Sequence, residues 1–189
     1  MAIVRRPSAS GCQTDDFSDS NSGWPTGYQP DGTFLTITGG EYHIYPIGFG
    51  DRFFNGWSAS EFQLSVEGRG EDGYYGLVFG QNQDTDIFAF YFFQINSTDG
   101  TYRLERWAPN PDDVVTWNGS SDAIHPGTET NELMVEREAG WITLYVNDEE
   151  VERVYDTMFT GDRLVGLGTF DIGEVHFENF TLCEISRSP

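Results

Sequence analysis

Lysine is absent from this chain of 189 residues, and its ten cationic residues are all arginine. Aspartate and glutamate together number 31, so the formal net charge is −21 at pH 7. A surface of this charge repels phosphate backbones, which excludes nucleic acid as a partner. An acidic surface favours solubility and suits calcium-rich or salty surroundings.

Long apolar runs are also missing. No stretch approaches the roughly 20 consecutive apolar residues that a membrane-spanning helix needs, so the sequence predicts no membrane span. The opening segment Met1–Ser10 contains two arginines but no apolar stretch behind them. No signal peptide is recognisable in this segment.

Cysteine is scarce, and the two cysteines, Cys12 and Cys183, lie close to opposite ends of the chain. Because sheets often pair their first and last strands, we expect a disulfide between them; two separate thiols are the alternative. A bridge closing so long a loop stabilises a fold by roughly 5 kcal/mol in the chain-entropy model. It also implies an oxidising compartment, and we expect an extracellular or cell-surface location.

Helical periodicity is also missing. No window keeps apolar residues at a 3.6-residue repeat, whereas apolar and polar residues alternate with a period of two along most of the chain. Aromatic residues make up 15% of the chain and glycines number 22, as in aromatic strands separated by glycine turns. The predicted strands are Thr33–Thr38, Glu41–Ile47, Ser60–Glu67, Tyr74–Gln81, Ile87–Asn96, Thr101–Trp107, Val114–Trp117, Asn131–Arg137, Trp141–Asn147, Glu150–Tyr155, Leu164–Phe170 and Val175–Ile185. The sequence therefore predicts an all-β, antiparallel jelly-roll sandwich of two curved sheets, with one domain over residues 15–185 and tails at 1–14 and 186–189.

Two of these strands have unusual patterns. Between Ile87 and Ile95, apolar side chains fall on both faces, so this strand is either central between two layers or lines a groove. In the last strand, Phe177 and Phe180 are three residues apart, where strict alternation requires two or four. A β-bulge at Glu178–Asn179 would return both rings to the core.

Eight short motifs follow one another along the chain. They are Asp15–Asp19 with Ser22–Trp24, Gly40–Ile44, Tyr75–Phe79, Asp99–Leu104, Asn131–Leu133, Ile142–Asn147, Val165–Leu167 and Phe177–Phe180. In this order they resemble bacterial concanavalin A-like (laminin-G-like) jelly-roll domains, similar to the 3-keto-disaccharide hydrolase domain family and more distantly to family 16 glycoside hydrolases. The resemblance covers Asp15 to Leu182 and implies the fold. It leaves activity open, because this fold hosts lectins, adhesins, hydrolases and inert spacers.

A retaining hydrolase of the family 16 type needs Glu-x-Asp-x-Glu on one face of a strand, with carboxylates about 5 Å apart. The comparable stretch here carries Glu61 and Glu67, six residues and roughly 20 Å apart along a strand. Gln63 and Ser65 stand where the other acids belong. We therefore expect no catalytic residues of this type.

The three histidines, His43, His125 and His176, are scattered along the chain without metal-ligand spacing. The resemblance offers a calcium site instead, since family 16-like jelly rolls often hold a calcium ion between the first and last strands. Glu178 at the expected bulge, the backbone oxygen of Gly40, and Asp16 match that arrangement. Hard oxygen ligands suit Ca²⁺, so we expect a structural calcium ion as the only cofactor; a solvated Glu178 is the alternative.

Exposed aromatic rings can stack on sugars, and the chain has five tryptophans. Trp24 and Trp141 are expected to be packed. Trp57, Trp107 and Trp117 lie at strand ends or beside loops, where a binding platform would be built, although each can also be buried.

These observations favour a non-catalytic extracellular or cell-surface module that binds glycans or another surface protein. One alternative is a hydrolase or lyase acting on 3-keto-glycosides or related sugars, which the nearer family implies. Another is a structural subunit that assembles through its N-terminal tail. Met1–Ser10 joins β-prone residues to two arginines, so we expect it to lie along the acidic body of its own or a neighbouring subunit.

Overall fold

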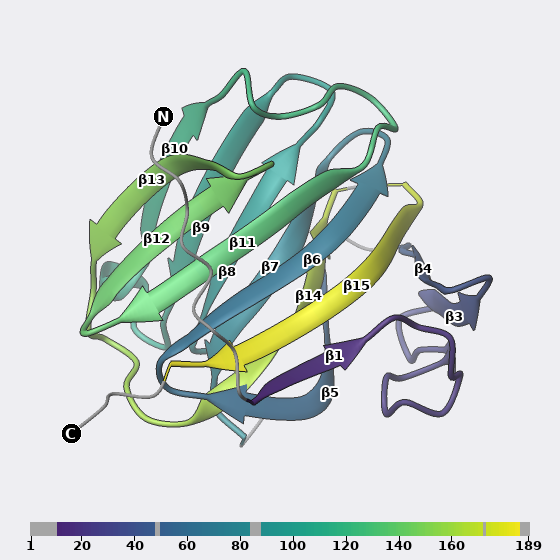
Figure 1. Ribbon diagram of the computed structural model, residues 1–189, viewed down its shortest axis with the longest axis horizontal. Coiled ribbons are helices and arrows are strands. Elements are labelled where there is room, and N and C mark those ends of the chain that lie inside the picture. The colour runs from purple at the N-terminus through teal and green to yellow at the C-terminus, as the bar shows by residue number, and fades with distance from the viewer. Residues whose placement is uncertain (1–10, 48–49, 84–87, 172, 186–189) are drawn as a thin grey trace.

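Two antiparallel sheets packed face to face make up the computed structural model, which describes residues 11–47, 50–83, 88–171 and 173–185 (Figure 1). The nine-stranded sheet has the order β13-β12-β11-β6-β15-β4-β3-β2, with β1 paired to β15. Its strands are β1 (Cys12–Asp15), β2 (Gly27–Tyr28), β3 (Phe34–Thr38), β4 (Glu41–Tyr45), β6 (Phe62–Gly70), β11 (Asn131–Glu138), β12 (Trp141–Val146), β13 (Glu149–Tyr155) and β15 (Val175–Glu184). The six-stranded sheet has the order β10-β9-β8-β7-β14-β5. Its strands are β5 (Asp51–Ala59), β7 (Tyr74–Gln81), β8 (Phe90–Asn96), β9 (Thr101–Trp107), β10 (Val115–Ser120) and β14 (Arg163–Phe170).

The expected all-β jelly-roll sandwich is therefore confirmed, and helix is nearly absent. Among the described residues the one helix is the 3₁₀ turn η1 (Pro111–Asp113), where the Asn110 side chain accepts a hydrogen bond from the Asp112 amide. The described part of the chain holds no helix long and apolar enough to span a membrane.

All twelve predicted strands are present, with ends that shift by at most three residues, but β1, β2 and β5 were not predicted. The β5 sequence contains Asn55-Gly56, a pair typical of hairpin turns. Gly56 instead adopts a φ of 92° inside the strand, where the pairing of β5 with β14 changes register. The turn signal here marks a bulge and not a chain reversal.

The inner faces of the two sheets enclose one core rich in aromatic rings. The hydroxyl groups of buried tyrosines in this core are hydrogen-bonded: Tyr42 donates to the Pro25 carbonyl oxygen at 2.8 Å and Tyr91 to the Asp156 carboxylate at 2.7 Å. Each polar tip therefore keeps a partner while its ring fills the core.

Strand β8 shows which of its two expected roles is correct. Tyr91, Phe93 and Ile95 point into the core between the sheets. Phe90 and Phe92 point to the opposite face, where they join a separate apolar cluster that lines a pocket. The groove interpretation therefore holds for this strand.

The expected bulge in β15 is also present. Asn179 has a φ of 54°, and the pairing of β15 with β6 shifts register between Glu178 and Thr181. As a result, Phe177 and Phe180 are both fully buried.

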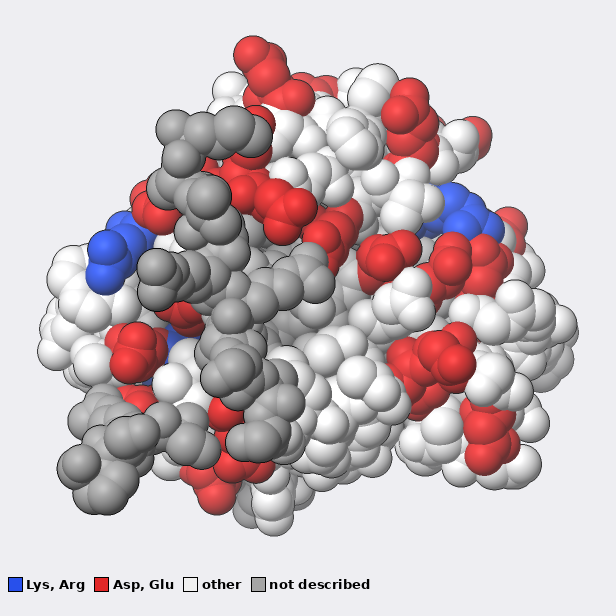
Figure 2. All heavy atoms as spheres, in the orientation of Figure 1, with Lys and Arg blue, Asp and Glu red and all other residues white. Residues whose placement is uncertain are grey.

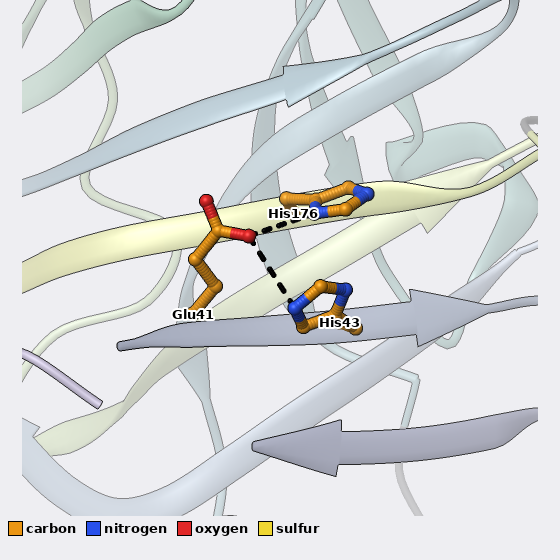
Figure 3. Close-up of side chains that lie close together, drawn as sticks. All are labelled: Glu41, His43 and His176. Carbon is orange, nitrogen blue, oxygen red and sulfur yellow. Dashed lines mark hydrogen bonds and ion pairs between the residues drawn. The ribbon is translucent and has the colours of Figure 1, made fainter. Parts of the chain in front are cut away.

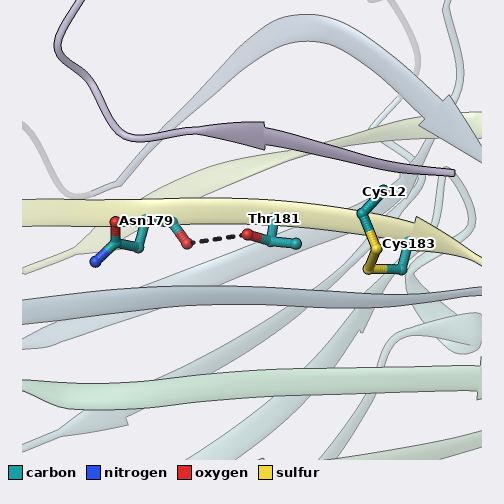
Figure 4. Close-up of a disulfide and its surroundings, with 4 residues drawn as sticks. All are labelled: Cys12, Asn179, Thr181 and Cys183. Carbon is teal, nitrogen blue, oxygen red and sulfur yellow. Dashed lines mark hydrogen bonds between the residues drawn. A yellow bond between two sulfur atoms is a disulfide. The ribbon is translucent and has the colours of Figure 1, made fainter. Parts of the chain in front are cut away.

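The predicted disulfide joins Cys12 in β1 to Cys183 in β15, which are direct partners in the antiparallel ladder (Figure 4). Strand β1 begins at Cys12, so the paired structure starts before the predicted domain boundary at Asp15. The contact expected from Met1–Ser10 lies outside the described residues.

Two tryptophans that we expected to be packed behave differently. Trp24 is buried and donates its indole N–H to the Asp15 carboxylate at 2.9 Å, so the opening motif is structural. The expectation for Trp141 is wrong, because its side chain is 42% exposed and packs against Tyr155 and Arg153 on the molecular surface. Trp141 is the first residue of β12, which forms a hairpin with the edge strand β13.

Candidate functional site

The outer face of the six-stranded sheet carries an unusual concentration of aromatic side chains. Since side chains alternate along a strand, β8 sends Phe90 and Phe92 to this face, and β9 sends Trp107. Phe54 from β5 and Phe170 from β14 pack against the same cluster. A strand that is apolar on both faces thus supplies the core with one set of rings and the outer surface with another.

These rings line a pocket of about 190 Å³, which we call the aromatic pocket. Its walls include Arg52, Phe90, Phe92, Trp107 and Phe170, and the 61% exposed ring of Phe88 stands at its edge. The rings of Phe90 and Trp107 are stacked, with centroids 6.1 Å apart and planes at 12°. The pocket therefore offers flat apolar faces to a ligand.

A glycine in the neighbouring strand makes room for this arrangement. A Cβ atom at Gly168 would lie 2.9 Å from Cζ of Phe92 and 2.7 Å from Cγ2 of Val78. No larger residue fits there without moving the Phe92 ring.

Arg52 places a cation at the edge of the aromatic pocket. Its guanidinium carbon lies 4.1 Å from the ring centroid of Phe90 and 4.7 Å from that of Phe88, and its Nη1 donates to the Gln81 side chain at 3.2 Å. Burial lowers the pKa of Arg52 from its ordinary value, and the group is still a cation at neutral pH.

Glu105 fixes the polar side of the pocket. Its carboxylate accepts hydrogen bonds from Gln94 Nε2 at 3.0 Å and from the Trp107 indole N–H at 3.1 Å. Nε of Arg103 lies 3.6 Å from the other carboxylate oxygen, while the guanidinium covers the Tyr74 ring at 3.9 Å. This network holds the Trp107 ring in one orientation.

Of the tryptophans predicted to bind a ligand, the structure places one in this pocket. Trp107 lines it, whereas Trp57 and Trp117 pack against the core from the inner face. Trp57 lies against Phe180 with ring centroids 5.6 Å apart. The sequence missed Arg52, Phe90 and Glu105, although the two-sided apolar pattern around Phe90 pointed to this surface.

The residues predicted to bind calcium lie around β4 and β15. A Cβ atom at Gly40 would lie 3.8 Å from the Asp16 carbonyl oxygen, so these two backbone segments are close. The Asp16 carboxylate accepts from the Ser18 amide at 3.0 Å, and Glu178 pairs with Arg69 at 2.9 Å. Calcium binding by this set stays a prediction.

Two histidines that the sequence analysis called scattered are direct cross-strand partners. His43 in β4 pairs with His176 in β15, and their rings lie 4.2 Å apart, so the earlier expectation is wrong for this pair (Figure 3). Glu41, two residues before His43 in β4, joins them on the outer face of the nine-stranded sheet. Burial opposes its ionisation, but hydrogen bonds from His176 and Arg69 prevail and lower the pKa of Glu41 to about 2.

The carboxylates considered for hydrolysis do not meet at the aromatic pocket. Glu61 precedes β6 and accepts from the Ala139 amide, while Glu67 in β6 accepts from Asn179. Glu67 therefore belongs to the nine-stranded sheet, and Glu61 lies directly before one of its strands. The carboxylates among the described residues that line the aromatic pocket are Asp51 and Glu105.

No protein family defined by a sequence profile matches the chain, and no curated protein sequence does. Solved structures match over nearly the whole chain. A carbohydrate-binding module, CBM66, from Bacillus subtilis is similar with a TM-score of 0.57 and 16% identity, covering 94% of this chain and 98% of that one. The catalytic domain of an endo-1,3-beta-glucanase (laminarinase) from Thermotoga petrophila gives a TM-score of 0.66 at 8% identity, with 93% and 97% covered.

A beta-glucanase from Bacillus licheniformis has a TM-score of 0.62 at 12% identity, with 93% of this chain and 99% of that one covered. These identities establish the fold and nothing finer. The chain adopts the concanavalin A-like jelly-roll fold that the sequence motifs resembled, and this fold is similar to that of the carbohydrate-binding module and of the two glucanases.

Proposed function

We propose that the protein is a non-catalytic glycan-binding module, and that the aromatic pocket is its binding site. The observation that carries the proposal is the combination of stacked rings with a fixed polar network on one open sheet face. Sugar rings present apolar C–H faces and polar hydroxyl edges. Flat aromatic faces beside oriented donors and acceptors complement both.

The rims of the pocket suit hydroxyl groups. Arg52 offers N–H donors and Glu105 offers acceptor lone pairs, and each is held in place by protein contacts before a ligand arrives. This preorganisation lowers the ordering cost of binding. The carbohydrate-binding module among the structural neighbours supports the same class of ligand.

Glycoside hydrolysis is the competing function, since laminarinases and glucanases share the fold. A retaining mechanism needs two carboxyl groups about 5 Å apart that can each react with the sugar. Glu105 is already bonded to Gln94 and Trp107, and Asp51 accepts a hydrogen bond from Thr33 at 2.8 Å. Because both carboxylates are already engaged in hydrogen bonds with the protein, their arrangement favours glycan binding over glycoside hydrolysis.

An extracellular or cell-surface setting is part of the proposal. The disulfide between Cys12 and Cys183 persists only where thiols are not kept reduced. The charge of −21 keeps such a module soluble and keeps it away from polyanions. Glycans or glycosylated surface proteins are then the accessible partners.

A glycan array with and without calcium tests this function. We expect binding to one glycan class, and Trp107→Ala to weaken it by about tenfold or more, because a stacked ring at a binding centre contributes about 1–2 kcal/mol. Trp141→Ala is the matched control, since this tryptophan is exposed on the other sheet. Calcium removal leaves glycan affinity unchanged if the ion at Asp16, Gly40 and Glu178 is structural.

Two results contradict the proposal: equal loss of binding in both tryptophan variants, or no binding to any glycan by the folded protein. Turnover of a glucan or of a 3-keto-glycoside establishes the hydrolytic alternative instead. Circular dichroism of each variant separates loss of the site from loss of the fold.

A further inference from the structure

The outer face of the nine-stranded sheet brings together two imidazoles and two carboxylates that no function above uses. Glu41 and His43 come from β4, His176 comes from β15, and Glu174 immediately precedes that strand. The ligand atoms of Glu41, His43 and His176 all lie within 4.8 Å of one another. In Figure 3 the Glu41 carboxylate points at both rings, with a dashed contact to each.

We propose that Glu41, His43 and His176 bind a divalent transition-metal ion such as Zn²⁺, with Glu174 orienting the two imidazoles.

The separations on the Glu41 side fit one ion. Oε2 of Glu41 lies 3.0 Å from Nδ1 of His176 and 3.3 Å from Nε2 of His43. Zinc bonds to nitrogen and oxygen are about 2.0–2.1 Å long, so tetrahedral ligands stand roughly 3.3 Å apart. The two distances from Oε2 of Glu41 to the histidine nitrogens match this spacing, so little side-chain movement is needed to place one ion among the three ligand atoms.

On the sides that point away from Glu41, both imidazole rings face the carboxylate of Glu174. Oε1 of Glu174 lies 2.8 Å from Nε2 of His176 and 3.5 Å from Nδ1 of His43. A metal-bound imidazole usually donates its second N–H to a carboxylate or carbonyl oxygen, which fixes its tautomer. Glu174 occupies that position at His176, and at His43 it lies on the corresponding side of the ring without forming a hydrogen bond.

Nδ1 of His176 lies beside two side chains of opposite charge. It is 3.0 Å from Oε2 of Glu41 and 3.2 Å from Nη2 of Arg69, and its role in these contacts depends on the tautomer. With the ring proton on Nε2, where Glu174 lies 2.8 Å away, Nδ1 presents a lone pair next to the Glu41 carboxylate. This nitrogen and Oε2 of Glu41 are then two adjacent ligands for one cation.

His43 supplies an unsatisfied atom. Its Nδ1 is buried and makes no hydrogen bond, although Oε1 of Glu174 lies 3.5 Å away. Buried polar atoms without partners are uncommon in folded proteins. Metal binding at Nε2 fixes the proton on Nδ1 and directs it towards Glu174.

Charge and access also suit an ion. Arg69 contacts Oε1 of Glu41 at 2.5 Å and Glu178 at 2.9 Å, so it keeps two partners when an ion takes the His176 lone pair. Glu41, Glu174 and Glu178 outweigh this one positive charge. A polar pocket of about 400 Å³, lined in part by Arg69, Glu174 and His176, gives the ion a route from solvent.

Calorimetric titration of the tag-free full chain with Zn²⁺ at pH 7.5, and a visible absorption spectrum with Co²⁺, test the site. We expect one ion per chain. His43→Ala and His176→Ala abolish stoichiometric binding, and Glu174→Gln weakens it roughly tenfold. His125→Ala is the matched control, because this histidine lies elsewhere and bonds to the Thr130 carbonyl.

Absence of stoichiometric Zn²⁺ binding by the folded wild-type chain overturns the proposal. So does binding that survives both His43→Ala and His176→Ala, or Ca²⁺ binding of equal strength that is insensitive to them, since the acidic surface is then responsible. If either alanine variant unfolds, His43→Gln and His176→Gln, which keep polar side chains of similar length, replace them. Glycan binding is measured separately, so this proposal and the proposed function can fail independently.

Discussion

The two sheets use their outer faces in opposite ways. On the six-stranded sheet, Arg52 and Arg103 lie over aromatic rings, and Glu105 is held in a hydrogen-bond network. On the nine-stranded sheet, Glu67 stands opposite Glu132 in β11 and Glu178 in β15. Figure 2 shows the molecule from this second side, where Asp and Glu side chains form many separate patches and Lys or Arg side chains few.

Like charges directly opposite each other in a sheet are destabilising, whereas aromatic cross-strand pairs stabilise. The nine-stranded sheet therefore carries an electrostatic cost that the other does not. Side-chain contacts such as those of Arg69 with Glu41 and Glu178 offset part of it. Backbone alternation is the same in both sheets, so the residue types at the outward positions make the difference.

Loss of the disulfide is the largest expected perturbation, and it acts on the nine-stranded sheet. Cys12→Ser with Cys183→Ser opens a loop of 171 residues. The free energy of unfolding should fall by up to about 5 kcal/mol, because the unfolded chain regains its freedom. Denaturant unfolding measures the loss, and glycan affinity of the folded variant should not change. A parallel loss of affinity would show that the two outer faces are coupled.

Filling the space at Gly168 is the next largest change, and it acts on the aromatic pocket. Gly168→Ala places a Cβ atom 2.9 Å from Phe92, so the ring must move outward at a cost of about 1–3 kcal/mol. Thermal unfolding and glycan binding should both weaken. Gly173→Ala is the control, because a Cβ atom there meets only the Glu71 carbonyl oxygen at 3.9 Å. Equal effects of the two substitutions would contradict the packing argument.

Asp51→Asn should give the smallest effect, visible as a change in pH dependence. Burial and the neighbouring Asp31 raise the pKa of Asp51 above its ordinary 3.8, despite the hydrogen bond from Thr33 and the nearby charge of Arg52. A raised carboxyl pKa means that the folded state binds the proton more tightly, so stability falls as pH rises from 3.8 through the native pKa. The destabilisation is fully present above the pKa values of both the unfolded and the folded state, and it is absent below both of them.

Unfolding of wild type and Asp51→Asn between pH 3 and 7 measures this effect. The variant should lose that part of the pH dependence and gain relative stability at pH 7. The prediction fails if the free energy of unfolding of the wild type rises with pH in this range and Asp51→Asn removes that rise. Such a result would show that the native pKa of Asp51 is lowered.

Local patterns predicted most of the fold because they act through neighbouring residues. Alternation along Tyr74–Gln81 and Thr101–Trp107 predicted strands with those same bounds. The three-residue spacing of Phe177 and Phe180 predicted a bulge, since only an extra residue lets both rings reach one core. Strand β5 was not predicted, and it contains Asn55-Gly56 at a bulge, where the residue types are the same as in a turn.

The candidate sites were harder to predict because they depend on which strands become neighbours. Trp57, Trp107 and Trp117 are alike in the sequence, yet one faces the aromatic pocket and the others face the core. Nothing local distinguishes the two faces of an amphipathic strand until its partners are known. Trp141 was misplaced for the same reason.

The sequence by itself determined the acidic charge, which follows from composition, and most of the strands, their alternation and the bulge in β15, which follow from residues close together in the chain. The pairing of β4 with β15 was decided by tertiary structure alone. It brings Glu41 within 3.0 Å of His176 across 135 residues of sequence. Antiparallel pairing is a long-range choice, made by burying Phe177, Val175 and their counterparts in one core. Outward-facing residues such as His43 and His176 therefore meet because of what their inward-facing neighbours bury.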